Sequence, residues 1–233
     1  MYKLLTGGGL GDAMIAMAKF YSRFVLEDCQ VTHGVSHRQW INNIQSLYNY
    51  QEIKCKVEYT IWREEIETKS KIHDYFLHTT WNAKIHEDEI LKYFPEDWEI
   101  EPFPPLKYNK RQDVDIVISP VAGMEFKRKL NDSSLMKLAD RISKTNHITY
   151  VGHGRPMNHY PGTSLINKTT IPELVDIICS ANVVIGAEGL VTWLGAMADK
   201  KVFMQIDNLP GIKRRQHPKW NIALFNDMRE VEL

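Results

Sequence analysis

The stretch Ala181-Asn-Val-Val-Ile-Gly-Ala-Glu-Gly-Leu-Val-Thr-Trp-Leu-Gly-Ala-Met197 decides the fold of this chain. It predicts a short buried strand over residues 183–186, a turn in which glycine follows Glu188, and an apolar helix from about Leu190 to Ala198. Such a turn at the carboxyl edge of a parallel sheet places Glu188 and the next backbone N–H groups where α/β proteins bind nucleotides and sugars. The sequence therefore predicts an α/β fold with a ligand site at this turn.

The rest of the second half continues the alternation of strand and helix. Thr170, with Pro172 and Glu173 behind it, is a helix-start signature, and an apolar face recurs at helical spacing over residues 135–142. Further buried strands are predicted over residues 115–119, 148–151 and 201–206. Because parallel strands need helical crossovers, this half predicts a parallel sheet of doubly wound type.

The first half opens in the same way. A strand over residues 2–5 leads into the glycine-rich loop Gly7-Gly-Gly-Leu-Gly11, and a helix with a buried face that includes Met14 and Met17 follows. The alternation continues with predicted strands over 31–35 and 53–59, and with predicted helices over 38–48 and 87–94.

The run Pro102-Phe-Pro-Pro105 fits neither a helix interior nor a central strand, so it predicts a linker. We therefore place the domain boundary there. The sequence predicts one Rossmann-like domain over residues 1–105 and a second over residues 106–233.

Composition narrows the class of protein. The 233 residues include 29 basic and 29 acidic side chains, so no net charge draws the chain to nucleic acid or to anionic lipid. The three cysteines lack CxxC spacing, which argues against a disulfide framework and against a zinc site. No run of about 18 apolar residues occurs, and the N-terminal residues do not resemble a signal peptide. We expect a protein of the cytoplasm without a membrane span.

Three separated segments resemble motifs of glycosyltransferase family 9, the heptosyltransferase-like enzymes, and so does the turn at Glu188. These segments are Gly9-Leu-Gly-Asp12, Pro120-Val-Ala-Gly-Met-Glu-Phe-Lys-Arg128 and Asn167-Lys-Thr-Thr-Ile-Pro-Glu-Leu174. The chain is shorter than most members, and it has Glu188 and Gly189 where many members have a Thr-Gly pair. It therefore resembles a short, divergent member, and a phage-type enzyme is one interpretation.

The resemblance implies the GT-B architecture, in which two Rossmann-like domains with parallel sheets enclose an interdomain cleft. It also implies an inverting glycosyltransferase that moves a sugar from a nucleoside-diphosphate-sugar donor to a hydroxyl acceptor. The donor is then a co-substrate, and no cofactor is expected. The divergent turn leaves the nucleotide and the sugar of the donor open.

The resemblance gives Asp12 the role of catalytic base and places Lys127 and Arg128 against the donor diphosphate. Physical chemistry agrees, because a carboxylate at a helix N-terminus stays ionised and cations neutralise a leaving phosphate. The glycines that leave room for a substrate are Gly8, Gly9, Gly11 and Gly186. Two plainer interpretations stay open: Asp12 as a helix cap, and the basic pair as solvated surface.

Glu188 is predicted to accept hydrogen bonds from donor hydroxyls, and the amides of Gly189 and Leu190 are predicted to meet phosphate. A capping role for Glu188 remains the alternative. Further donor contacts are assigned to Thr169, His153 and Arg155. A lone histidine of this kind is more often structural.

The glycines at 7–11 do not complete GxGxxG, so a dinucleotide cofactor is not expected. The Asp113-Val-Asp115 triplet leads into an apolar strand, and we predict no required metal. A glycan is one possible acceptor. The basic cluster Lys213-Arg-Arg215 instead suits a phage-type enzyme that glycosylates a hydroxymethylated DNA base. A nucleotide-sugar-binding protein without catalysis, or an epimerase of the same fold, is the alternative of another class.

Overall fold

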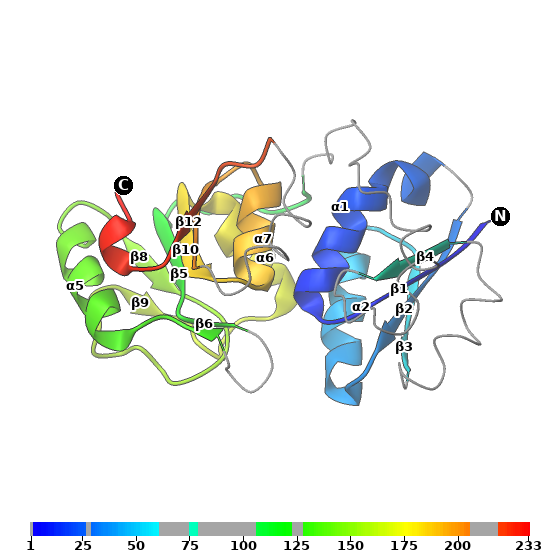
Figure 1. The fold of residues 1–233 in the computed structure, drawn as a ribbon, viewed down its shortest axis with the longest axis horizontal. Helices are drawn as coiled ribbons and strands as arrows, with labels where there is room; N and C mark the ends of the chain where they lie inside the picture. The colour runs from blue at the N-terminus through cyan, green and yellow to red at the C-terminus, as the bar shows by residue number, and fades with distance from the viewer. Residues whose placement is uncertain (1, 27–28, 61–74, 79–105, 123–127, 206–218) are drawn as a thin grey trace. The chain divides into compact units, whose positions relative to one another are not determined.

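The computed structural model describes residues 2–26, 29–60, 75–78, 106–122, 128–205 and 219–233. The described residues up to 78 belong to one compact unit and those from 106 onward to a second (Figure 1). Each unit is built on a parallel sheet with helical crossovers, so the predicted α/β class is confirmed. The predicted helix over 87–94 and the predicted linker over 102–105 lie outside the described residues.

The first unit holds a four-stranded parallel sheet in the order β3-β2-β1-β4. Its elements are β1 (Tyr2–Gly7), α1 (Leu10–Leu26), β2 (Cys29–Val35), η1 (Arg38–Trp40), α2 (Ile41–Tyr50), β3 (Cys55–Tyr59) and β4 (Tyr75–His78). Sequence analysis found β1 to β3 and missed β4. The chain proceeds from β1 outward to β3 and then places β4 on the other side of β1, so the strand order reverses between β1 and β4. Figure 1 shows α1 and α2 together on one face of this sheet.

The second unit holds a six-stranded sheet in the order β12-β11-β10-β5-β8-β9, and all of its pairs are parallel. The strands are β5 (Ile116–Ser119), β8 (Ile148–Tyr150), β9 (Thr163–Ser164), β10 (Val183–Ala187), β11 (Lys201–Gln205) and β12 (Ile222–Phe225). A separate antiparallel hairpin joins β6 (Val121–Ala122) to β7 (Arg128–Lys129). Sequence analysis missed β9, β12 and this hairpin.

The helices of the second unit lie on both faces of its sheet. They are α5 (Asp132–Ile142), α6 (Ile171–Ser180) and α7 (Leu190–Met197), followed near the C-terminus by the short η3 (Met228–Glu230). Figure 1 shows α5 on one side of the sheet and α6 and α7 on the other. The chain leaves β5 for β8, returns past β5 and enters β10, so the strand order reverses between β5 and β10.

Alternate residues of the central strands fill the two faces. Ile116, Ile118 and Ile185 pack in one cluster with the buried face of α5, whose four predicted apolar residues are all buried: Leu135, Leu138, Ala139 and Ile142. Val184 faces the opposite way, toward Gly195 of α7. A strand that is covered on both faces must be apolar throughout, which explains why β5 and β10 lack polar alternation.

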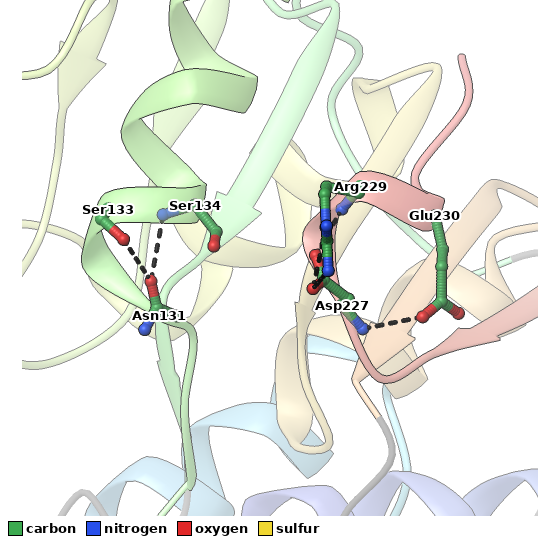
Figure 2. A network of polar contacts seen from close by, with 6 residues as sticks. All are labelled: Asn131, Ser133, Ser134, Asp227, Arg229 and Glu230. Atoms are coloured by element: carbon green, nitrogen blue, oxygen red, sulfur yellow. Dashed lines mark hydrogen bonds and ion pairs between the residues drawn. The ribbon is translucent and has the colours of Figure 1, made fainter.

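Side-chain caps fix the ends of α5 and η3 (Figure 2). The Asn131 side-chain oxygen accepts a hydrogen bond from the Ser134 backbone N–H at 3.0 Å. Asp227 accepts from the Arg229 N–H at 2.9 Å, and the Glu230 carboxylate accepts from the Asp227 N–H at 3.0 Å. Each cap supplies an acceptor for an N–H group that the helix itself leaves unpaired.

The predicted start of α6 is confirmed as a reciprocal capping box. The Glu173 carboxylate accepts from the Thr170 backbone N–H and from the Thr170 hydroxyl, both at 2.8 Å. These hydrogen bonds, the backbone one foremost, hold the pKa of Glu173 below its ordinary value. The hydroxyl of Thr170 is therefore committed to the helix start.

In the parts of the chain that the structure describes, no helix is long and apolar enough to cross a membrane.

Replacing Gly195 by alanine is expected to destabilise the second unit. A Cβ at Gly195 would lie 2.8 Å from Cγ2 of Val184, deep in the core. The overpacking costs about 1–3 kcal/mol and outweighs the gain in helix propensity of about 1 kcal/mol. Chemical denaturation measures the loss. The double variant Gly195→Ala with Val184→Ala should recover part of it, and a Gly195→Ala protein as stable as the parent would contradict this packing.

Candidate functional site

Several of the predicted site residues lie near the two places where a strand order reverses. In open α/β sheets the crevice outside the carboxyl ends of the strands at such a switch point is where ligands bind. The turn that follows β1 carries Gly8, Gly9 and Asp12, and the turn that follows β10 carries Glu188 and Gly189. Each unit thus presents one candidate carboxylate at its own switch point.

In the first unit the turn is shorter than predicted. Helix α1 begins at Leu10, so Gly11 lies in its first turn and is not a loop residue. Gly8 has φ +117°, a conformation that glycine adopts readily. A Cβ at Gly8 would lie 2.5 Å from Oδ2 of Asp12. The glycine therefore makes room for the Asp12 carboxylate.

Asp12 is the third residue of α1, and its Oδ2 accepts a hydrogen bond from the Gly9 backbone N–H at 2.9 Å. Asp12 is therefore not the N-cap residue itself, but its carboxylate accepts a hydrogen bond from the residue that precedes the helix. A carboxylate has acceptor sites on both of its oxygens, so this hydrogen bond is compatible with a second role.

Sequence analysis missed a buried histidine behind this turn. His33 lies in β2, and its ring nitrogens contact the Tyr48 hydroxyl at 3.0 Å and the Gly8 carbonyl at 3.2 Å. His33 and Tyr48 are both fully buried. The available signal was a histidine inside the apolar strand 31–35, where a polar side chain needs partners.

Thr6 is a second buried polar residue at the same end of β1. Its hydroxyl is the one buried side-chain polar atom without a hydrogen-bond partner among the described residues. Thr6 pairs in register with His33, so the two side chains lie on the same face of the sheet.

In the second unit the turn after β10 lies close to the end of β5. Gly186 is a strand residue of β10 and not a loop residue. A Cβ on it would lie 2.9 Å from the Ser119 carbonyl and 3.2 Å from Cγ2 of Thr192. Only a residue without a side chain fits this contact. Ser119 is buried and ends β5, and sequence analysis did not single it out.

Glu188 is almost completely buried and is bound by Arg128. Nη1 of Arg128 lies 3.0 Å from Oε2 of Glu188 and also donates to the Glu188 main-chain carbonyl. The side chain of Arg128 is 32% exposed and that of Glu188 is 4% exposed. Arg128 belongs to β7 and not to a polar loop, and Lys127 lies outside the described residues. The structure thus joins two residues that were predicted to bind the sugar donor, Arg128 and Glu188, in one ion pair.

The Gly189 amide has a partner within the chain. It donates to the Thr192 hydroxyl at 3.1 Å, and this hydroxyl is also 3.1 Å from the Gly189 carbonyl. The bond disfavours the predicted contact between the Gly189 amide and phosphate. Leu190 is the first residue of α7, as predicted. A Cβ at Gly189 would lie 2.8 Å from the Ala122 Cβ, so the hairpin packs on this turn.

The loop after β8 also reaches this edge of the sheet, because a Cβ at Gly152 would lie 3.3 Å from the Ser119 hydroxyl. Asn167 ties the loop down: its side chain accepts from the Gly154 amide at 3.1 Å and donates to the Gly154 carbonyl at 2.8 Å. His153 lies 3.3 Å from the same Asn167 oxygen and is exposed, as is Arg155. Thr169 directly precedes the cap of α6.

The acidic triplet has structural partners. Asp113 pairs with Arg111 at 3.2 Å, and Asp115 accepts from the His147 amide at 2.8 Å. Within the described ranges, no group of three or more His, Cys, Asp or Glu side chains is placed to hold a metal ion. The basic cluster over 213–215 lies outside the described residues.

No family model matches the chain, and no curated protein matches it. Solved structures do. ADP-heptose lipopolysaccharide heptosyltransferase II of E. coli superimposes with a TM-score of 0.64 at 10% identity, over 97% of this chain and 90% of that one. A glycosyltransferase of family 9 from Veillonella parvula gives 0.62 at 9% identity, over 96% and 86%. E. coli heptosyltransferase WaaC with ADP gives 0.60 at 10%, over 98% and 96%.

The chain has the GT-B type of fold of these glycosyltransferases. The predicted likeness to heptosyltransferase-like enzymes of family 9 is thereby confirmed at the level of the fold. At such low identity the superposition carries the fold alone, and the roles of individual residues rest on the geometry described above.

Replacing Thr6 by valine is expected to stabilise the protein. Valine has nearly the same shape, suits a strand, and removes a buried hydroxyl that has no partner within the chain. The free energy of unfolding should rise by about 1 kcal/mol. Thr6→Ser, which keeps the hydroxyl and loses the methyl group, is the control and should lower it. A destabilised Thr6→Val protein would show that the hydroxyl has a partner in solution.

Removing Arg128 is expected to destabilise the second unit through the charge that it leaves behind. Arg128→Met removes the cation that pairs with the buried Glu188 carboxylate. The free energy of unfolding should fall by about 1–3 kcal/mol. Adding Glu188→Gln removes that charge and should restore most of the stability. Thermal unfolding of both single variants and the double variant measures the coupling. Strictly additive losses would mean that the two side chains do not depend on each other.

Proposed function

We propose that the chain is an inverting glycosyltransferase that moves a sugar from a nucleoside-diphosphate-sugar donor to a hydroxyl acceptor. One observation carries the proposal: in a chain of this fold, each sheet places a candidate carboxylate at its own switch point. The first unit supplies Asp12 and the second supplies Glu188.

Asp12 is assigned the role of base. Inverting transfer is a single displacement, in which the acceptor oxygen attacks the anomeric carbon while the nucleoside diphosphate leaves from the opposite face. A carboxylate must take the proton of the attacking hydroxyl. Asp12 suits this task because the Gly9 amide orients its carboxylate at the start of α1.

Glu188 is assigned to the donor. Arg128 holds its carboxylate at the carboxyl ends of β5 and β10, where it can accept hydrogen bonds from sugar or ribose hydroxyls. The ion pair has no net charge, so Arg128 offsets little of the diphosphate charge. We therefore assign that task mainly to Lys127, and the proposal requires no metal ion.

The first experiment tests for transfer. Donors carrying different nucleotides, ADP-sugars included, are screened by thermal shift, since a ligand that binds the native state raises its stability. Nucleoside diphosphate release is then followed with a glycan acceptor and with DNA that contains hydroxymethylated bases. Release that requires an acceptor supports a transferase. A sugar product without an acceptor would indicate an epimerase, and binding without turnover would indicate a binding protein.

Asp12→Asn is expected to lower kcat by about 100-fold or more, because the amide cannot take a proton. The KM for the donor should change little, since the donor is assigned to the second unit. Steady-state kinetics with the acceptor saturating separates the two constants. Asn can still accept the Gly9 hydrogen bond, so the turn should persist, and a normal kcat would remove Asp12 from the reaction.

Glu188→Gln should instead raise the KM for the donor about 10-fold, the equivalent of about 1.4 kcal/mol of lost binding. Its kcat at saturating donor should stay within about 3-fold of the parent, because this assignment rests on binding and not on proton transfer. For the parent protein, transfer in excess EDTA should proceed at the same rate as without EDTA, because no metal ion is required. A loss of kcat at unchanged KM would contradict the binding role of Glu188.

A further inference from the structure

We propose that His33 is a positioning residue that sets the Asp12 carboxylate through the peptide group between Gly8 and Gly9. The inference rests on the proposed function, in which Asp12 is the base. It assigns a role to a buried histidine that neither the sequence motifs nor the fold likeness single out.

The first step concerns the hydrogen on the histidine ring. Nε2 of His33 lies 3.2 Å from the carbonyl oxygen of Gly8, and a carbonyl can only accept, so Nε2 carries the hydrogen. In the neutral ring Nδ1 is then an acceptor, and the Tyr48 hydroxyl at 3.0 Å donates to it. Tyr48 thereby selects the tautomer that can hold Gly8.

The second step is that Tyr48 is built to remain a donor. Its side chain is fully buried, and this burial, with a smaller contribution from neighbouring Cys55, raises its pKa well above the ordinary value. The Tyr48 hydroxyl therefore keeps its proton near neutral pH. Burial raises the pKa of the neighbouring Cys55 thiol in the same way.

The third step is geometric. The Gly8 carbonyl and the Gly9 N–H belong to one planar trans peptide group, in which they point in opposite directions. His33 holds the carbonyl, and the N–H donates to Oδ2 of Asp12 at 2.9 Å. A rotation of this peptide plane would break both contacts together. Fixing one end thus aims the other at the carboxylate.

The turn needs such a hold because glycine itself provides none. Gly8 has φ +117°, and glycine visits many backbone conformations at little cost. The remaining polar groups of the turn are also engaged: the Gly8 N–H donates to Gly34 at 3.2 Å, and the Gly9 carbonyl accepts from Ala13 at 3.0 Å. Both of these contacts are between main-chain groups, whereas the His33 contact comes from a side chain of a neighbouring strand.

The test uses two amides that each copy one half of the ring. In His33→Gln the side-chain nitrogen extends as far as Nε2 and can still donate to Gly8. In His33→Asn the amide occupies the place of Nδ1 and can reach Tyr48 only. Both variants lose the aromatic ring, so a purely structural role predicts similar losses in both.

Transfer kinetics, thermal unfolding and hydrogen exchange of the Gly9 amide are measured on the full chain. We expect His33→Asn to lower kcat about 10-fold or more at unchanged donor KM, since a small misplacement of a reacting group has a large effect on rate. His33→Gln should stay within about 3-fold. The Gly9 amide should exchange faster in His33→Asn than in His33→Gln, although both have similar melting temperatures.

Equal kcat in the two variants, or losses that follow the melting temperature, would overturn the inference. Tyr48→Phe is the second probe, because it removes the donor to Nδ1 and leaves the packing; an unchanged kcat and Gly9 exchange would again overturn it. Asp12→Asn separates the two proposals. If that variant is as active as the parent, the assignment of Asp12 as the base fails, and Gly9 exchange alone then decides whether His33 holds the turn.

Discussion

The return of the chain across its own first strand is the constraint on which the rest of the structure depends. In each sheet the chain forms one strand, β1 or β5, and then adds strands on one side of it. The chain then crosses over and adds the next strand on the other side. At such a reversal a crevice opens outside the carboxyl end of the strand. Residues at this point are positioned by the sheet and need not fill its core, so polar side chains can gather there.

Polar groups at both points are buried, and each has been given a partner by another element of its own unit. Arg128 on a small hairpin binds Glu188, and Tyr48 on α2 binds His33. Burial of a polar group without a partner costs about 1–3 kcal/mol, and more for a charged group. Thr6 is the described exception, because its buried hydroxyl lacks such a partner.

Much of this fold could be predicted from the sequence, because its strands are continuous apolar runs and its helices are amphipathic. The cap at Thr170 and the turn at Glu188 followed from local chemistry and were confirmed. Strands β4, β9 and β12 were missed, and all three lie at the edge of a sheet. The pairing of Arg128 with Glu188 joins residues 60 positions apart, and the contact of His33 with Gly8 spans 25. Neither leaves a local signal.

The two carboxylates differ in what holds them, and this difference supports the roles that we propose for them. The Glu188 carboxylate is held in an ion pair with the Arg128 guanidinium. Asp12 accepts a hydrogen bond from the Gly9 main-chain amide, which orients its carboxylate. A base must exist in both protonation states within each turnover, whereas a binding group does best to remain in one. Asp12 therefore suits proton transfer and Glu188 suits recognition, although both are carboxylates beside glycines at the end of a parallel strand.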